Sequence, residues 1–215
     1  MDIPLFSEYG VNYLVRWGHL LFGIVWIGLL YYFNFVQTEY FKEADADHRS
    51  GAIQKLVPRA LWWFRWGAAF TFLTGLYLLY RLHGAMTYDI TVGATLGTLM
   101  AFNVWFIIWP NQKIVIASAT QVAGGGEALP EAAAAAPKAG LASRTNTLFS
   151  IPMLFFMGSS AHLPSGMVTD EMAASTVSLV AVFAIILLLQ VNAIRGKQGP
   201  MTSVVGVIHC GLGLT

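Results

Sequence analysis

The sequence predicts an all-α integral membrane protein, a helical bundle of five full transmembrane helices with a short or truncated sixth. Three observations carry this prediction. Only 11% of the 215 residues are charged, whereas a soluble domain has about 25%. Hydrophobic residues make up 56% of the chain, and the mean hydropathy is +0.62. Apolar runs near the length that crosses a bilayer, about 20 residues, recur along the sequence.

The predicted spans follow one another along a single transmembrane domain, 1–215. The five full spans are 11–36, 60–82, 90–109, 147–162 and 172–194. A sixth apolar run, 201–215, begins after Pro200, a residue suited to the first turn of a helix. At 1.5 Å per residue this run covers about 22 Å, less than the roughly 30 Å hydrocarbon core. We therefore expect a sixth helix that is cut short or that crosses part of the bilayer.

The longest connection between predicted spans is 117–142. It contains three consecutive glycines, 124–126, and five alanines between Glu131 and Pro137. This composition is typical of a flexible linker, so we predict a flexible cytoplasmic loop. A helical extension followed by a tether is the alternative.

Basic residues predict the orientation of the bundle, because cytoplasmic loops carry an excess of lysine and arginine. The connections after the first, third and fifth spans are basic, whereas the opposite side holds only Arg16 and Arg81. We therefore expect the N-terminus on the outer side of the membrane. The basic residues on the cytoplasmic side are Lys42, Arg49, Lys55, Arg59, Lys113, Lys138, Arg144, Arg195 and Lys197.

Four of the five histidines lie in or at the ends of predicted spans. His19 is inside the first span, and a histidine within a membrane helix usually has a partner or a ligand. In the predicted orientation His83 and His162 lie at the outer surface, and His209 lies near mid-membrane. None of these four is near the cytoplasmic end of a span. His48 falls in a charged loop and is interpreted as a solvated surface residue.

This grouping of histidines predicts a haem b site, because neutral imidazole is a common ligand of haem iron. The expected axial ligands are drawn from His19, His83, His162 and His209. A glycine lies one turn from three of them and leaves room for the flat ring: Gly23, Gly158 and Gly213. Arg16 and Arg81 would meet the propionates. One haem is the simpler expectation, and four histidines suffice for two.

Each of these residues also has a structural interpretation. Glycine is frequent in membrane helices, where it permits close packing, and histidines at span ends are common interfacial residues. Asn34 and Asn103 are expected to bond across helices. The sequence contains no Cys-x-x-Cys-His, no nucleophile–base pair and no phosphate loop, and its net charge of +1 gives no reason to expect nucleic acid. Membrane-embedded acids typical of an ion pathway are missing as well.

Three segments resemble a known family. They are 16–28 (RWGHLLFGIVWIG), 105–113 (WFIIWPNQK) and 143–157, with SRTNT at its start and PMLFFM at its end. Together they resemble the N-terminal membrane domain of the bacterial membrane-bound urate hydroxylase family, the cytochrome-c-coupled urate oxidases, over about residues 11–195. The His-x-x-x-Gly-x-x-Trp-x-Gly pattern of the first segment is also similar to membrane protoporphyrinogen oxidases and copper-resistance membrane proteins.

The resemblance implies a multi-helix membrane domain. We expect a multi-pass protein of the bacterial inner membrane, and the distribution of basic residues predicts that its N-terminus lies in the periplasm. In full-length urate-oxidising members further spans and a cytochrome c domain follow, so we expect a short form without that domain. The expected function is a haem b redox protein that transfers electrons, or oxidises a urate-like substrate, towards the periplasmic side. A periplasmic cytochrome c or a membrane redox complex is the expected partner. The alternative is a cofactor-free accessory subunit of a larger homo- or hetero-oligomer in the bilayer.

Overall fold

The computed structural model describes residues 4–163, 165–166 and 176–215, and all regular elements within them are helices. A short 3-10 turn, Pro4–Phe6, precedes α1 (Glu8–Tyr31), which runs through a π-helix, η2 (Tyr32–Gln37), into α2 (Thr38–Glu43). The helices α3 (Ala46–Lys55) and α4 (Val57–Arg81) follow. The chain returns through α5 (Tyr88–Phe102), a second π-helix, η3 (Asn103–Ile108), and α6 (Trp109–Ala123).

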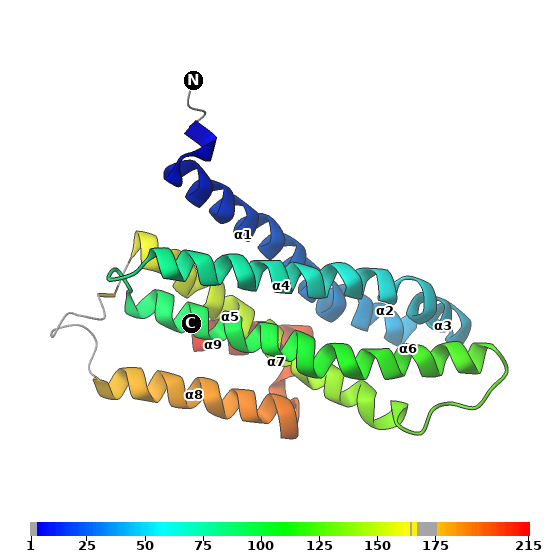
Figure 1. Ribbon diagram of the computed structural model, residues 1–215. Helices are drawn as coiled ribbons and strands as arrows, with labels where there is room; N and C mark the ends of the chain where they lie inside the picture. The colour runs from blue at the N-terminus through cyan, green and yellow to red at the C-terminus, as the bar shows by residue number, and fades with distance from the viewer. Residues whose placement is uncertain (1–3, 164, 167–175) are drawn as a thin grey trace.

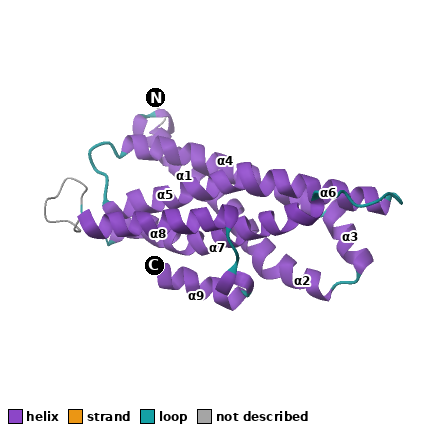
Figure 2. Cartoon of the chain, turned by 90° about the horizontal axis from the view of Figure 1, so that it is seen from below, coloured by secondary structure: helices purple, strands orange, loops and turns teal. Residues whose placement is uncertain are grey.

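The remaining elements are the long helix α7 (Ala132–His162), α8 (Thr176–Arg195), a 3-10 turn (Gly199–Thr202) and α9 (Val204–Leu214). The helices α4, α5, α7 and α8 lie lengthwise along the molecule (Figure 1), and α1 runs beside α4 when the molecule is seen from below (Figure 2). The most extensive contacts join α1 to α4 and α5 to α7. The long helix α7 also contacts α6, α8 and α9, so it is the centre of the bundle.

Local chemistry explains where several helices begin. The hydroxyl of Ser7 accepts from the Gly10 amide at 3.2 Å, that of Thr87 from Ile90 at 3.1 Å, and that of Ser203 from Gly206 at 2.9 Å. Each of these caps satisfies a backbone N–H that has no partner within its helix. A proline stands in the first turn of α4 and of α6, where a missing N–H costs nothing.

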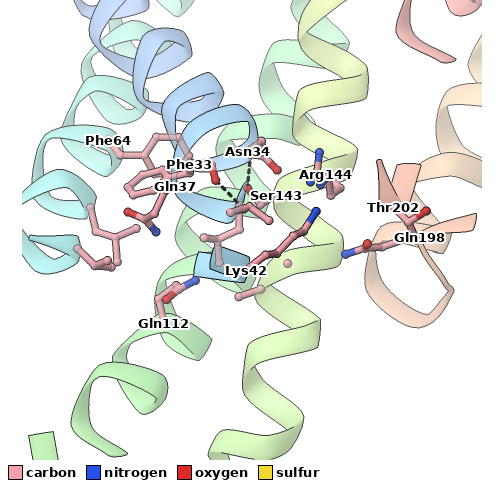
Figure 3. Close-up of a pocket in the computed structure, with 16 residues that line it drawn as sticks. Phe33, Asn34, Gln37, Lys42, Phe64, Gln112, Ser143, Arg144, Gln198 and Thr202 are labelled. Carbon is pink, nitrogen blue, oxygen red and sulfur yellow. Dashed lines mark hydrogen bonds between the residues drawn. The ribbon is translucent and has the colours of Figure 1, made fainter. Parts of the chain in front are cut away.

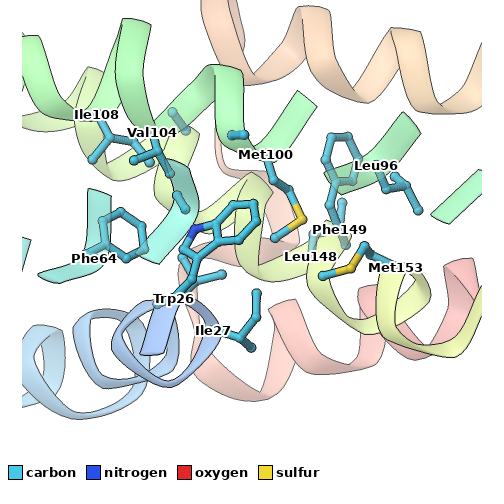
Figure 4. Packing of buried hydrophobic residues seen from close by; sticks show 14 of the residues in the cluster. Trp26, Ile27, Phe64, Leu96, Met100, Val104, Ile108, Leu148, Phe149 and Met153 are labelled. Carbon is cyan, nitrogen blue, oxygen red and sulfur yellow. The ribbon is translucent and has the colours of Figure 1, made fainter. Parts of the chain in front are cut away.

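The apolar core lies where α1, α4, α5 and α7 meet (Figure 4). Trp26, Leu30, Phe64, Met100 and Phe149 are each at most 2% exposed. Close helix contact is permitted by glycine: a Cβ built on Gly93 of α5 would lie 2.9 Å from Met157 Cγ and 3.1 Å from its amide nitrogen on α7. Small residues at such contacts are typical of helix packing in membranes.

The structure confirms the all-α class. Three helical segments among the described residues are long and apolar enough to cross a membrane: Glu8–Glu43, Tyr88–Ala123 and Val177–Arg195. The second and fourth predicted spans correspond to α4 and to part of α7, which are not among these three segments, so five full spans are not shown. The sixth apolar run forms the short helix α9, and 172–175 of the fifth predicted span lies outside the described residues.

The segment 117–142 differs from the predicted loop. The helix α6 continues to Ala123, and α7 begins at Ala132, so that only 124–131 is outside helices. Alanine is the best helix former, and Ala135 and Ala139 are buried against the bundle. The alanine-rich composition thus marks a helical extension, the alternative that the sequence left open, rather than a linker.

Candidate functional site

His19 lies at the interface between α1 and α4. Its Nδ1 is 3.1 Å from the hydroxyl oxygen of Thr74, and its ring passes so close to Gly75 that a Cβ there would lie 3.2 Å from Cε1. The ring is half-buried. The glycine at position 75 is therefore what lets the imidazole lie flat against α4.

The tautomer of His19 follows from the bonds of Thr74. The Thr74 hydroxyl has one hydrogen, and it donates to a carbonyl of its own helix, that of Phe70 at 2.6 Å or of Thr71 at 3.0 Å. With its hydrogen so engaged the Thr74 oxygen is an acceptor, and we assign the donor hydrogen of the 3.1 Å contact to Nδ1 of His19. In this tautomer the lone pair of the neutral ring lies on Nε2, and the ring also has a backbone hydrogen-bond contact with Thr71. A histidine whose other nitrogen is held in this way is set up to bind a metal.

The remaining predicted ligands lie on other elements than His19. His83 follows the end of α4, His162 ends α7, and His209 lies in α9, and all three are exposed. Among the described residues no three histidine, cysteine, aspartate or glutamate side chains lie close enough together to hold a metal ion. The structure thus offers one half-buried imidazole on α1 and three exposed imidazoles on other elements.

The glycines and arginines that were predicted to border the haem have different surroundings in the structure. Gly23 lies near Thr71, whose Cγ2 would be 3.9 Å from a built Cβ, so it belongs to the α1–α4 interface below His19. Gly158 and Gly213 are open: a Cβ there would meet nothing within 4 Å in the described structure. Arg16 is exposed, and Arg81 forms an ion pair with Glu8.

Asn34 and Asn103 bond across helices, as predicted, and both bonds reach α7. Asn34 donates to the Ser143 hydroxyl at 2.8 Å. Asn103 donates to Asn146 Oδ1 at 2.8 Å and exchanges two hydrogen bonds with Gln190 of α8, at 3.0 and 2.6 Å. Both asparagines belong to π-helices, a type of irregularity that is frequent at functional sites.

A polar cavity of about 280 Å³ lies beside the first of these asparagines (Figure 3). Its walls come from η2, α2, α4 and α7, with one residue each from η3 and α6, and the segment 198–202 borders it. Arg144 and Gln37 line this cavity, and sequence reasoning missed both as functional residues, because Arg144 was counted only as a charge in a loop. The signal that was available is the polar run 143–147 directly before an apolar stretch.

Comparison with known proteins identifies the family. A model described as urate oxidase N-terminal matches residues 81–212, more than half of the chain. The chain belongs to the urate oxidase N-terminal family. No curated protein and no solved structure matches it.

The family assignment confirms the resemblance found in the sequence. The matched region of this urate oxidase N-terminal protein contains α5 to α9, and thus Arg144 and the buried asparagine on η3. It begins at Arg81, so α1 and His19 precede it. Family membership and apolar helices together indicate a membrane protein with a urate-hydroxylase-like function.

Proposed function

We propose that this chain is a haem b-binding membrane redox protein of a urate-oxidising system and that His19 is an axial ligand. The observation that carries the proposal is the Nδ1–H bond to Thr74, which leaves Nε2 with a free lone pair. Haem b supplies one-electron transfer when bound. Membership of the urate oxidase N-terminal family supplies the substrate class.

The residues around His19 fit one axial ligand and its supports. Thr74 would hold the tautomer and orientation of the ring, and Gly23 and Gly75 would keep α1 and α4 free of bulk beside it. Arg16, exposed and one turn from His19, would bind a propionate. Arg81 would do so only at the expense of its pair with Glu8. A second ligand, or a second haem, would come from His83, His162 or His209, with Gly158 beside His162.

The proposed arrangement places His19 towards the periplasmic face of a bacterial inner membrane. The positive-inside rule supports it, since Lys42, Arg49 and Lys55 gather beyond the other end of α1. In this orientation His19 would lie within reach of a periplasmic cytochrome c or another member of a membrane redox complex. The chain would act as a urate-oxidase-like oxidoreductase or as its electron-transfer subunit.

An accessory subunit without cofactor is the second candidate function. The observation in its favour is the apolar surface of α1, where Tyr9, Tyr13, Trp17, Leu20 and Ile24 are 54–88% exposed. Such a surface suits lipid or the helices of a partner. Native mass spectrometry in mild detergent separates the two: a stable monomer carrying haem contradicts the accessory role, and a cofactor-free complex supports it.

The haem proposal is tested on protein purified from its native membrane. A pyridine haemochrome spectrum is recorded for the wild type, for His19→Ala and for the matched control His48→Ala, whose ring lies on the exposed helix α3. We expect the Soret band in the wild type and the control and its loss in His19→Ala. An unchanged band in His19→Ala would remove this residue as ligand, and a wild type without haem would overturn the proposal.

A further inference from the structure

The cavity beneath the two π-helices contains a buried cation without a full set of partners. Arg144 is 4% exposed, and its Nη1 is buried without a hydrogen-bond partner in the described structure. Its Nη2 lies 3.9 Å from Glu39 Oε1, too far for a hydrogen bond. A guanidinium keeps its charge in any protein environment, so a buried and underpaired arginine is costly unless an anion joins it.

The local charge balance is positive. Glu39 is engaged by Lys42, whose Nζ is 2.8 and 2.7 Å from its two carboxylate oxygens. The residues that line the cavity include the two cations Lys42 and Arg144 and no carboxylate. Two cations therefore share the one nearby carboxylate, and a net positive charge faces the cavity.

The cavity also contains an unpaired acceptor. Gln37, on the first π-helix, has its Oε1 buried without a partner among the described residues. Gln37 and Arg144 come from different walls, and Lys42 lies between them in Figure 3. An oxyanion without a hydrogen atom, such as sulfate, would satisfy Arg144 and leave the Gln37 oxygen unpaired, because that oxygen only accepts hydrogen bonds. The matching ligand is an anion that also donates.

The volume and the lining of the cavity further restrict the class of ligand that it can bind. A volume of about 280 Å³ is at the lower limit of ligand pockets, which run from about 300 to 1,000 Å³. Phe33 and Phe64, packed edge to face at 5.5 Å, provide an apolar wall, and Gln112 and Gln198 add amide groups. Aromatic walls combined with amides and a cation suit a flat, polar ring.

We propose that this cavity is a binding site for a small planar organic anion with carbonyl acceptors and N–H donors, held by Arg144 and Gln37. Urate has this chemistry, so the inference deepens the proposed function and rests on it for the naming of urate. The cavity adjoins the C-terminal end of α1, whereas His19 lies 15 positions before Asn34 on the same run of helix. Anion binding and haem binding are thus assigned to opposite ends of one helix.

The test is isothermal titration of the purified full chain in mild detergent with urate, with inorganic phosphate and with phosphatidylglycerol vesicles. Arg144→Gln removes the cation, and Gln37→Leu removes the unpaired oxygen without breaking any hydrogen bond of the fold. The matched control is Arg65→Gln, because Arg65 stacks on Trp109 at 3.8 Å and does not line the cavity. Circular dichroism verifies the fold of each variant.

We expect urate to bind the wild type and Arg65→Gln alike, and its affinity to fall about 10- to 100-fold in Arg144→Gln. Gln37→Leu should weaken the binding of urate, because it removes the acceptor for an N–H of the ligand. Equal urate affinity in Arg144→Gln and wild type would overturn the proposal. So would phosphate or phosphatidylglycerol binding more tightly than urate, since that would mark a site for a simple anion or a lipid headgroup.

The same preparation is examined for the Soret band, which keeps the two proposals separable. A preparation with haem but without urate binding overturns the cavity assignment and leaves the haem proposal standing. A preparation that binds urate through Arg144 but contains no haem overturns the haem proposal and supports the cavity.

Discussion

The two ends of α1 are packed differently. Its N-terminal half contacts α4 on one side and leaves side chains such as Tyr9 and Trp17 exposed on the other. Its C-terminal half, from Trp26 to the π-helix, is enclosed, with Leu30 fully buried and Asn34 3% exposed. One helix thus passes from a two-helix contact into the core of the bundle.

The difference shows how packing decides what a polar side chain can do. At the open end polar groups are paired singly, His19 with Thr74 and Glu8 with Arg81, and His19 keeps one nitrogen available. At the enclosed end several polar groups meet, and Arg144 and Gln37 remain underpaired around a cavity. A free imidazole nitrogen suits a ligand that approaches from the side, whereas a cavity suits a small ligand that fits within it.

The largest effect is expected from Asn103→Leu, in the buried polar network that joins η3 to α7 and α8. The substitution removes three hydrogen bonds and leaves groups of Asn146 and Gln190 unpaired in the core. Each such group costs about 1–3 kcal/mol. Thermal unfolding in mild detergent measures the change. Asn111→Leu is the control, since the described bond of the Asn111 side chain goes to the carbonyl of Ile107, one turn back in the preceding π-helix. Equal losses in the two variants would contradict a special role for the buried network.

Next in size is Gly67→Ala, which tests the contact between α1 and α4 at the boundary of the two halves. A Cβ on Gly67 would lie 3.1 Å from the Trp26 nitrogen and 3.3 Å from the Phe22 oxygen, so α1 must move. We expect a loss of about 1–3 kcal/mol in the free energy of unfolding. Gly28→Ala is the control, because a Cβ there meets nothing within 4 Å and alanine favours helix by about 1 kcal/mol. A stabilised Gly67→Ala would contradict the close approach.

A smaller effect is expected from Thr74→Val at the open end. It removes the acceptor that holds Nδ1–H of His19, at a cost of about 1 kcal/mol, and frees the ring to change tautomer. If His19 binds haem, the Soret maximum should shift while the band persists. Thr98→Val is the control, since Thr98 is bonded within its own helix to Ala94. An identical spectrum in both variants would show that Thr74 does not position His19.

The smallest effect is expected from Glu8→Gln, which removes the ion pair with Arg81. Both side chains are exposed, 69% and 37%, and water and salt screen such pairs. The melting temperature should change by less than in Thr74→Val, and the difference from wild type should vanish at high salt. A drop as large as that of Gly67→Ala would mean that this pair, rather than helix packing, holds the outer part of α1 against α4.

Much of the fold was predictable from the sequence, because apolar helices require continuous runs of apolar residues, and such runs can be recognised locally. Each apolar run coincides with a described helix, and Asn34 and Asn103 bond across helices as expected. The prediction differed at 117–142, where the alanines have the composition of a linker yet two of them pack against the bundle. Composition does not reveal whether a helix of small residues finds a partner.

The sequence by itself determined the helical class, the family and the presence of an unusual histidine inside an apolar helix. These depend on composition and on short motifs, which are properties of neighbouring residues. Tertiary structure alone decided which nitrogen of His19 is free, because that depends on Thr74, 55 positions away. It also decided that Arg144 and Gln37, which are 107 positions apart in the sequence, line the same cavity. Hydrogen bonds and cavities arise between distant segments, and no local pattern encodes them.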